Sequence, residues 1–249
     1  MGKNYPIQNK VALVTGANRG IGKAILESFI ANGAAKVYAA VRNTASVEAL
    51  VEKYGEKVVP LTLDLSKPET IAAAARLAGD VEVVVNNAGV YKAGGVLDAE
   101  VFEAWNYHTQ VNVFGLIHIA RAFAPVLKAN GGGAFVQLNS VVSFKSFAGA
   151  DLYAASKAAA YSVTQSLREH LADQDTLVLS VHPGPIATDM GSEAGLDDIA
   201  EPPAQVGDAI VEALASGEFH VYTDTLSRQL GGAYHSFAKG VVEAKLLEG

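Results

Sequence analysis

Short runs rich in β-branched residues alternate with longer stretches of helical composition along the whole chain. The apolar runs are Val11–Thr15, Val37–Val41, Val58–Leu63, Val81–Val85, Ala134–Leu138, Leu177–Val181 and His220–Thr223. The stretches between them are Gly20–Asn32, Ser46–Tyr54, Pro68–Ala78, Ala99–Lys128, Tyr153–Ala172 and Pro202–Ser216. Strands and helices that alternate in this way form a parallel sheet through right-handed crossovers. We therefore expect an α/β protein with a doubly wound sheet of about seven parallel strands and helices on both faces.

The composition fits one folded domain. Half of the 249 residues are apolar and 18% are charged, so the chain can bury a large core. No low-complexity linker divides it, and α/β folds of about 250 residues often form one domain, so we expect a single domain over residues 1–249. The net charge of −7 argues against a protein that binds nucleic acid.

Several residue types and patterns are absent from the sequence, and their absence limits the possible chemistry and location of the protein. It has no cysteine, which excludes disulfides, thiolate metal sites and cysteine nucleophiles. Its six histidines show no metal-ligand spacing, so we expect no metal. The most apolar long stretch, 113–127, contains His118 and Arg121, and the first ten residues are polar. We therefore expect neither a membrane span nor a signal peptide, and we place the protein in the cytoplasm.

A glycine-rich turn, Thr15-Gly16-Ala17-Asn18-Arg19-Gly20-Ile21-Gly22, joins the first predicted strand to the first predicted helix. Glycines let the backbone approach a pyrophosphate, which the free N–H groups and the positive end of the helix would bind. A plain strand-to-helix connection would also explain the glycines. The position after the first strand of an α/β chain favours a dinucleotide site.

Tyr153 and Lys157 lie four residues apart on a predicted helix and project from one face of it. A phenol with a pKa near 10 is a poor acid–base catalyst at neutral pH, and a neighbouring ammonium would stabilise its phenolate form. Such a pair by itself is more often part of a solvated helix face. Together with the glycine-rich turn and with Ser140, thirteen residues upstream of Tyr153, it indicates a catalytic group.

These segments resemble the short-chain dehydrogenase/reductase family, and the resemblance covers nearly the whole chain. Further matches follow in the family's order: Asp64-Leu65, Asn86-Asn87-Ala88-Gly89, Asn112, Ser140, Tyr153-Ala154-Ala155-Ser156-Lys157 and Pro183-Gly184-Pro185-Ile186-Ala187-Thr188. The resemblance implies a Rossmann-like fold. It also implies an oxidoreductase that reversibly reduces a ketone or aldehyde to an alcohol by hydride transfer, with Tyr153 as acid and base.

The resemblance assigns roles to four catalytic residues. Tyr153 would protonate the carbonyl oxygen, and Ser140 would hold that oxygen by a hydrogen bond. Lys157 would bind the nicotinamide ribose and tune Tyr153. Asn112 would hold a water that relays protons, unless it only satisfies helix backbone.

The resemblance also implies a set of cofactor-binding residues: Gly16, Asn18, Arg19, Gly20, Ile21, Gly22, Arg42, Asp64, Leu65, Asn87, Ala88, Gly89, Tyr153, Lys157, Pro183, Gly184, Ile186 and Thr188. Asp64 and Leu65 would flank the adenine, although Asp64 could equally cap the next helix. Asn87 would contact the adenosine side. The Ile186 backbone and the Thr188 hydroxyl would hold the carboxamide.

The end of the second predicted strand indicates which nicotinamide cofactor is bound. An NAD-specific protein would usually carry an acid near Val41, and none is present. Arg42 follows instead, and Arg19 lies in the glycine-rich turn. Two guanidiniums suit a ribose 2′-phosphate, so we expect NADP(H), unless both arginines are solvated surface charges.

The substrate is a small molecule whose class the sequence leaves open. The residues expected near it are Tyr91, Val142, Phe144 and Met190, and segment 189–203 is either a lid over the cleft or an ordinary surface loop. Their apolar character favours a ketone or aldehyde. The alternatives are a 3-oxoacyl thioester reductase, a polyol or sugar reductase and a non-enzymatic NADP(H) sensor. A sensor would not need the catalytic set.

The C-terminal part departs from the family's pattern. The family's glycine-rich segment after the last strand is missing, and the tail 231–249 carries Ala, Val, Leu and Lys at roughly helical spacing. We expect a homodimer or homotetramer. The long helices would form the contact if Phe114 and Phe123 are not buried against the sheet.

Overall fold

The computed structural model describes residues 4–244, which contain a seven-stranded sheet. All neighbouring strands are parallel, and their order is β3-β2-β1-β4-β5-β6-β7. The strands are β1 Val11–Thr15, β2 Lys36–Val41, β3 Val58–Thr62, β4 Val83–Asn86, β5 Ala134–Leu138, β6 Leu177–Val181 and β7 His220–Val221. The expected Rossmann-like, doubly wound sheet is confirmed.

Helices follow the strands at nearly the predicted places. The α-helices are α1 Gly20–Ala31, α2 Glu48–Tyr54, α3 Pro68–Leu77, α4 Val101–His108, α5 Gly115–Ala129, α6 Asp151–His170, α7 Asp189–Glu193, α8 Ala204–Ser216 and α9 Thr225–Phe237. Shorter helical segments are η1 Thr44–Val47, η2 Gly55–Lys57, η3 Thr109–Phe114, η4 Val141–Ser143, η5 Ala172–Gln174, η6 Asp197–Ile199 and η7 Ala238–Val242. Segment η3 is a π-helical turn that joins α4 to α5.

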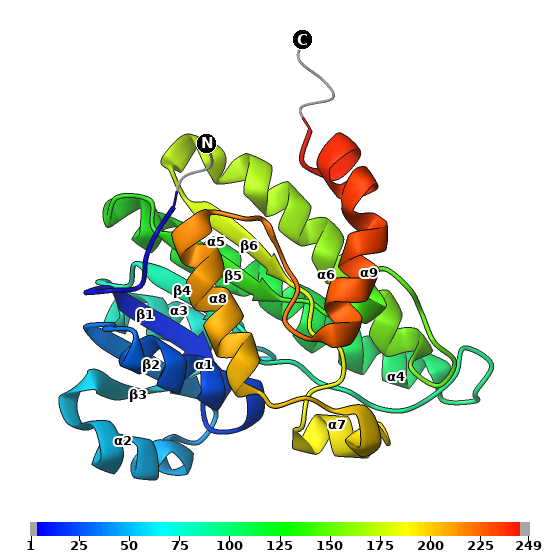
Figure 1. Cartoon of the computed structure of the whole chain (residues 1–249). Coiled ribbons are helices and arrows are strands. Elements are labelled where there is room, and N and C mark those ends of the chain that lie inside the picture. The colour runs from blue at the N-terminus through cyan, green and yellow to red at the C-terminus, as the bar shows by residue number, and fades with distance from the viewer. Residues whose placement is uncertain (1–3, 245–249) are drawn as a thin grey trace.

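Two apolar layers cover the two faces of the sheet (Figure 1). On one face α1 and α8 pack together and fully bury their side chains Phe29 and Ile210. On the other face α3, α5 and α6 bury Ile71, Phe123 and Ala160. Strand residues are buried on both faces, which explains their continuous apolar runs.

The helical stretch Val101–Ala129 is long and apolar enough to cross a membrane by length and composition. Its apolar side chains are used inside the protein, because Leu116, Ile119 and Phe123 are fully buried against the sheet. A helix in the core of a globular protein can reach the length and apolar composition of a membrane span in the same way. Phe123 is therefore not free to form a dimer contact, whereas Phe114 is 48% exposed. The oligomeric state stays a prediction.

Two segments differ from their expected local structure. Segment 189–203, expected as an irregular loop, begins with α7, where the Thr188 hydroxyl accepts a hydrogen bond from the Gly191 N–H. The C-terminal helix begins at Thr225 rather than near Gly231, because Asp224 caps it and Ser227 returns the bond. The part of the predicted tail from 245 onward lies outside the described residues.

Candidate active site

A cleft of about 2150 Å³ runs along the carboxyl ends of the strands. It crosses the point between β1 and β4 where the strand order reverses, which is where doubly wound sheets bind ligands. Every residue that the sequence assigned to the cofactor lines this cleft, and so do Ser140, Tyr91, Val142 and Met190. Two expected site residues, Asn112 and Phe144, are not among its lining residues.

The glycine-rich turn is closed so tightly that its glycines cannot carry side chains. A Cβ on Gly22 would lie 2.2 Å from the carbonyl oxygen of Gly16 and 2.6 Å from Nδ2 of Asn87. Gly16 itself has φ +68°, a conformation that L side chains rarely adopt. No side chain caps the start of α1, so its first N–H groups stay available to a ligand. This cradle fits a dinucleotide pyrophosphate.

Lys157 and Tyr153 project from α6 into the cleft. The Lys157 ammonium lies 5.8 Å from the centre of the Tyr153 ring and donates a 2.8 Å hydrogen bond to the Leu138 carbonyl at the end of β5. Lys157 is only 5% exposed and has no carboxylate partner among the described residues. Ser140 comes two residues after that strand end and also lines the cleft.

Burial shifts both titrating groups away from their charged forms. It raises the pKa of the Tyr153 phenol to about 12, while a hydrogen bond from Ser140 acts in the lowering direction. It lowers the pKa of Lys157 to about 8. The phenol is therefore protonated at neutral pH, and the ammonium is close to releasing its proton. Tyr153 is thus prepared to donate a proton.

Two side chains one helical turn apart hold the loop that follows β4. His108 Nε2 accepts a 3.0 Å hydrogen bond from the Lys92 N–H. Asn112 accepts a 2.9 Å bond from the Val90 N–H and donates 3.1 Å bonds to the Val90 carbonyl and to Ser156 Oγ. Tyr91, between these anchored residues, therefore lies edge-on to Tyr153 with ring centres 5.4 Å apart.

His108 was missed by the sequence reasoning. The available signal was its position four residues before Asn112, which places both on one helix face. The Asn112 amide groups are already hydrogen-bonded to the loop and to α6, and both amide hydrogens are used. A relay water would therefore have to bind mainly through the Asn112 backbone. Its relay role stays a prediction.

Arg42 and Asp64, which follow β2 and β3, line the part of the cleft expected to hold the adenosine. The Asp64 carboxylate accepts hydrogen bonds from the Ser66 N–H and hydroxyl, at 3.0 and 2.7 Å. Helix α3 begins later and has no side-chain cap, so Asp64 does not cap it. Arg19 forms an ion pair with Asp189 of α7 and would have to exchange this partner for a phosphate. Arg42 forms no ion pair within residues 4–244, and its charge acts on the neighbouring Asp64 carboxylate.

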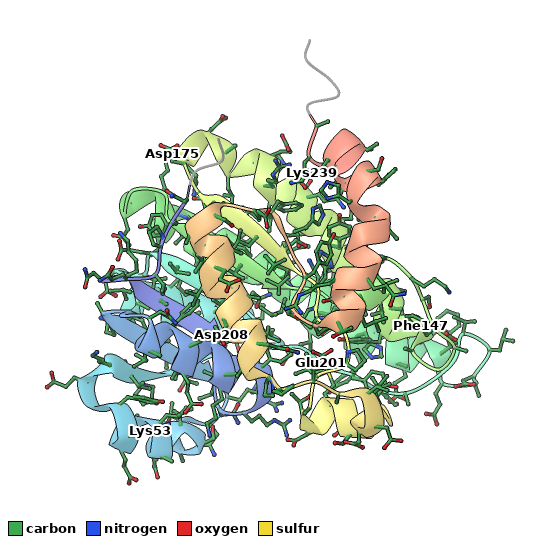
Figure 2. The ribbon with its side chains drawn as sticks, viewed as in Figure 1. Lys53, Phe147, Asp175, Glu201, Asp208 and Lys239 are labelled. Atoms are coloured by element: carbon green, nitrogen blue, oxygen red, sulfur yellow. The ribbon has the colours of Figure 1, made fainter. Side chains whose placement is uncertain are left out.

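The placement of Phe144 in the substrate pocket was wrong. Its ring stacks on His182 with centres 4.2 Å apart and meets Tyr234 of α9 at 4.5 Å. The short turn η4 directs the residue after it toward the sheet rather than into the cleft. Phe147, further along the same loop, does line the cleft and is 46% exposed; Figure 2 labels it.

Comparison with known proteins decides the family. The profile described as "short chain dehydrogenase" matches residues 10–198. The chain belongs to the short-chain dehydrogenase/reductase family. As in that family, it is an oxidoreductase whose fold binds a nicotinamide cofactor.

Individual members of this family match nearly end to end. An NADP-dependent 3-hydroxy acid dehydrogenase from Schizosaccharomyces pombe is 29% identical, over 94% of this chain and 98% of its own. The 3-oxoacyl-[acyl-carrier-protein] reductase FabG of Vibrio cholerae is 31% identical, over 92% and 98%. The structure of a short-chain dehydrogenase from Burkholderia cenocepacia in complex with NADP is 34% identical, with a TM-score of 0.84 and coverage of 98% and 100%.

Proposed function

We propose that this short-chain dehydrogenase/reductase is an NADP(H)-dependent carbonyl reductase that converts ketones or aldehydes to alcohols and works reversibly. One observation carries the proposal: Ser140, Tyr153 and Lys157 converge at one end of a cleft whose other end suits a dinucleotide. The cofactor, when bound, supplies the hydride. A sensor without turnover would not need a buried proton donor at this place.

The chain's own residues handle the carbonyl oxygen and its proton. Ser140 donates a hydrogen bond to that oxygen as negative charge develops on it. Tyr153 donates its phenolic proton to the same oxygen, and Lys157 then stabilises the phenolate. Because the pKa of Tyr153 is raised to about 12, the protonated phenol favours carbonyl reduction at neutral pH. Alcohol oxidation needs the deprotonated form and should become faster as the pH rises.

Arg42 is expected to decide between NADPH and NADH. It follows β2 at the adenosine end of the cleft, where its guanidinium would hold the 2′-phosphate. We expect Arg42→Asp to raise the KM for NADPH by about 10- to 100-fold, the cost of losing a charge-assisted contact, and to improve the use of NADH. Steady-state kinetics with both cofactors measure this. Arg76→Asp, on α3 outside the cleft lining, is the matched control, and an unchanged cofactor preference in Arg42→Asp would refute the argument.

The substrate end of the cleft favours neutral, apolar carbonyl compounds. Aromatic and apolar side chains line it, among them Tyr91, Tyr107, Phe147 and Met190. Among the described lining residues from 87 onward, Lys157 is the only cation, and it is buried beside the catalytic tyrosine. A carboxylate, a phosphate or an acidic carrier protein would find no free basic partner there. The thioester and polyol alternatives therefore fit less well than an apolar ketone.

A panel of carbonyl substrates tests the proposed function. NADPH oxidation is followed by absorbance with acetophenone, 4-acetylbenzoate, a 3-oxoacyl thioester and a ketose. We expect kcat/KM for acetophenone to exceed that for its carboxylate analogue by about tenfold or more, because a buried carboxylate would lack a partner. A preference for the thioester or the ketose would support those alternatives. Saturable NADPH binding without oxidation of any compound would support the sensor.

A further inference from the structure

His182 lies directly behind the catalytic serine and takes no part in the proposed chemistry. It follows β6 and is fully buried. Its Nδ1 lies 3.1 Å from the backbone carbonyl oxygen of Ser140, and its Nε2 lies 2.7 Å from Ser180 Oγ. Asn139 donates a 2.9 Å hydrogen bond to the same Ser180 hydroxyl. These contacts link the end of β6 to the end of β5.

The neighbours of His182 fix its tautomer. The Ser140 carbonyl has no hydrogen to give, so His182 Nδ1 carries the hydrogen and donates it there. In the neutral ring Nε2 then has no hydrogen, so it accepts from the Ser180 hydroxyl, which itself accepts from Asn139. Burial lowers the pKa of His182 to about 3, so the ring stays neutral at working pH. His182 therefore donates a permanent hydrogen bond to the backbone of Ser140.

Aromatic rings and the C-terminal segment hold His182 in place. Phe144 stacks on its ring at 4.2 Å, and Tyr161 meets it edge-on at 4.9 Å. Tyr234 of α9 covers Phe144 from the other side, with ring centres 4.5 Å apart. The expected tail thus forms one wall of this cluster.

The C-terminal segment is tied to the cluster by a chain of hydrogen bonds. Tyr161 Oη lies 2.7 Å from His220 Nε2, and His220 Nδ1 lies 3.0 Å from a Glu243 carboxylate oxygen. Lys239 donates a 2.9 Å hydrogen bond to the other Glu243 oxygen, and Figure 2 labels Lys239 on this C-terminal segment. Lys239 of η7 and Glu243, directly after η7, are therefore linked to Tyr161 and, through its ring, to His182.

Apart from its contact with the Tyr153 hydroxyl, the Ser140 side chain makes only long bonds to the backbone, which hold it weakly. Its hydroxyl lies 3.3 Å from the Pro183 carbonyl oxygen and 3.3 Å from the Val142 N–H. The place of the hydroxyl therefore depends on the Ser140 backbone. We propose that His182 is a positioning residue for Ser140 and that α9 and η7 support it through Phe144 and Tyr161. This inference rests on the proposed role of Ser140 in carbonyl reduction.

Replacing His182 with leucine and with asparagine separates its hydrogen bond from its bulk. Asparagine places an amide N–H near the position of Nδ1, and leucine has no donor. We expect H182L to lower kcat about 10- to 100-fold, because misplacement of a catalytic group has effects of this size, with the Kd for NADPH unchanged within about twofold. H182N should retain most of the activity. Equal losses in the two variants would overturn the proposal.

A double-mutant cycle with Ser140→Ala tests whether His182 acts through the serine. If it does, H182L should lower kcat less than about twofold when Ser140 is already alanine. If H182L lowers kcat by the same factor in the wild type and in the Ser140→Ala variant, His182 has an independent structural role, and the inference is overturned. If Ser140→Ala alone leaves kcat unchanged, the proposed function fails and the inference fails with it. The two failures are therefore distinguishable.

Two further variants guard against loss of folding and test the tail. Ser180→Ala removes the hydroxyl that pairs with His182 Nε2 and accepts from Asn139, and it should lower kcat by about threefold or more, even if H182L does not fold. Tyr234→Ala should lower kcat by a similar factor, because Phe144 loses its cover. Tyr222→Phe is the matched control in the same cluster. It removes a buried hydroxyl that has no hydrogen-bond partner within residues 4–244, so kcat should stay within about twofold. Unchanged kcat in both Ser180→Ala and Tyr234→Ala would overturn the proposal.

Discussion

Replacing Tyr153 with phenylalanine is expected to lower kcat for carbonyl reduction by about a thousandfold and to leave the Kd for NADPH within about twofold. The substitution removes only the hydroxyl, which lies beside Ser140 and donates the proton in the proposed reaction. The ring remains to pack against Tyr91, so the pocket should keep its shape. Steady-state kinetics and fluorescence titration with NADPH measure the two effects.

Tyr5→Phe is the control for the Tyr153 substitution. Its hydroxyl bonds to Glu82 at the amino ends of the strands, away from the cleft, so its kcat should match that of the wild type. A Tyr153→Phe variant with half the wild-type kcat would contradict the proposed proton donor. A large loss of NADPH affinity would mean that the phenol serves binding rather than chemistry.

Replacing Lys157 with methionine is expected to abolish most turnover and yet stabilise the protein without cofactor. The ammonium is buried with one hydrogen bond, to the Leu138 carbonyl, so its charge is costly when no cofactor is bound. A pKa lowered from 10.5 to about 8 corresponds to roughly 3 kcal/mol at neutral pH. Loss of the hydrogen bond offsets about 1 kcal/mol of this. We expect the free energy of unfolding of Lys157→Met to exceed that of the wild type by about 1–2 kcal/mol at pH 7.

The stability difference between Lys157→Met and the wild type should depend on pH. Between pH 8 and 10.5 the unfolded chain holds the Lys157 proton and the native protein does not. In the wild type the contribution of this group to the free energy of unfolding therefore rises with pH across that window. The advantage of Lys157→Met should be full below pH 8 and should shrink toward pH 10.5.

Urea unfolding of wild type and variant at pH 7 and pH 10 measures the difference. Lys145→Met is the control, because Lys145 is exposed and its removal should change stability by less than about 0.5 kcal/mol at either pH. A Lys157→Met variant less stable than wild type at pH 7 would show that the buried cation has partners which offset its cost. An advantage that grows with pH would contradict the lowered pKa.

The local part of the site could be predicted from the sequence. Glycine spacing in 15–22 encodes a turn that only residues without Cβ can form, and the clash at Gly22 shows why. The spacing of Tyr153 and Lys157 encodes one helix face, and both residues line the cleft. Such features depend on a few neighbouring residues, so the sequence contains all that is needed to predict them.

Predictions failed where a side chain's direction depends on distant elements. Phe144 was expected in the substrate pocket because it follows Ser140 closely, but the turn η4 directs it onto His182 and α9. The role of His108 depends on the loop after β4 crossing above α4. The sequence shows neither the direction of Phe144 nor the contact of His108 with this loop, because nothing local encodes where separate loops meet.

The sequence by itself determined the order of strands and helices along the chain, the glycine-rich turn and the spacing of the proposed catalytic residues. These follow from backbone conformation and side-chain periodicity, which act over a few residues. The tertiary structure decided what surrounds the catalytic residues: Tyr91 against Tyr153, the Leu138 carbonyl beneath Lys157, and His182 behind Ser140. These contacts join residues that are far apart in the chain, and burial there sets their pKa values and hydrogen bonds. Only the packed sheet and helices bring such residues within reach of one another.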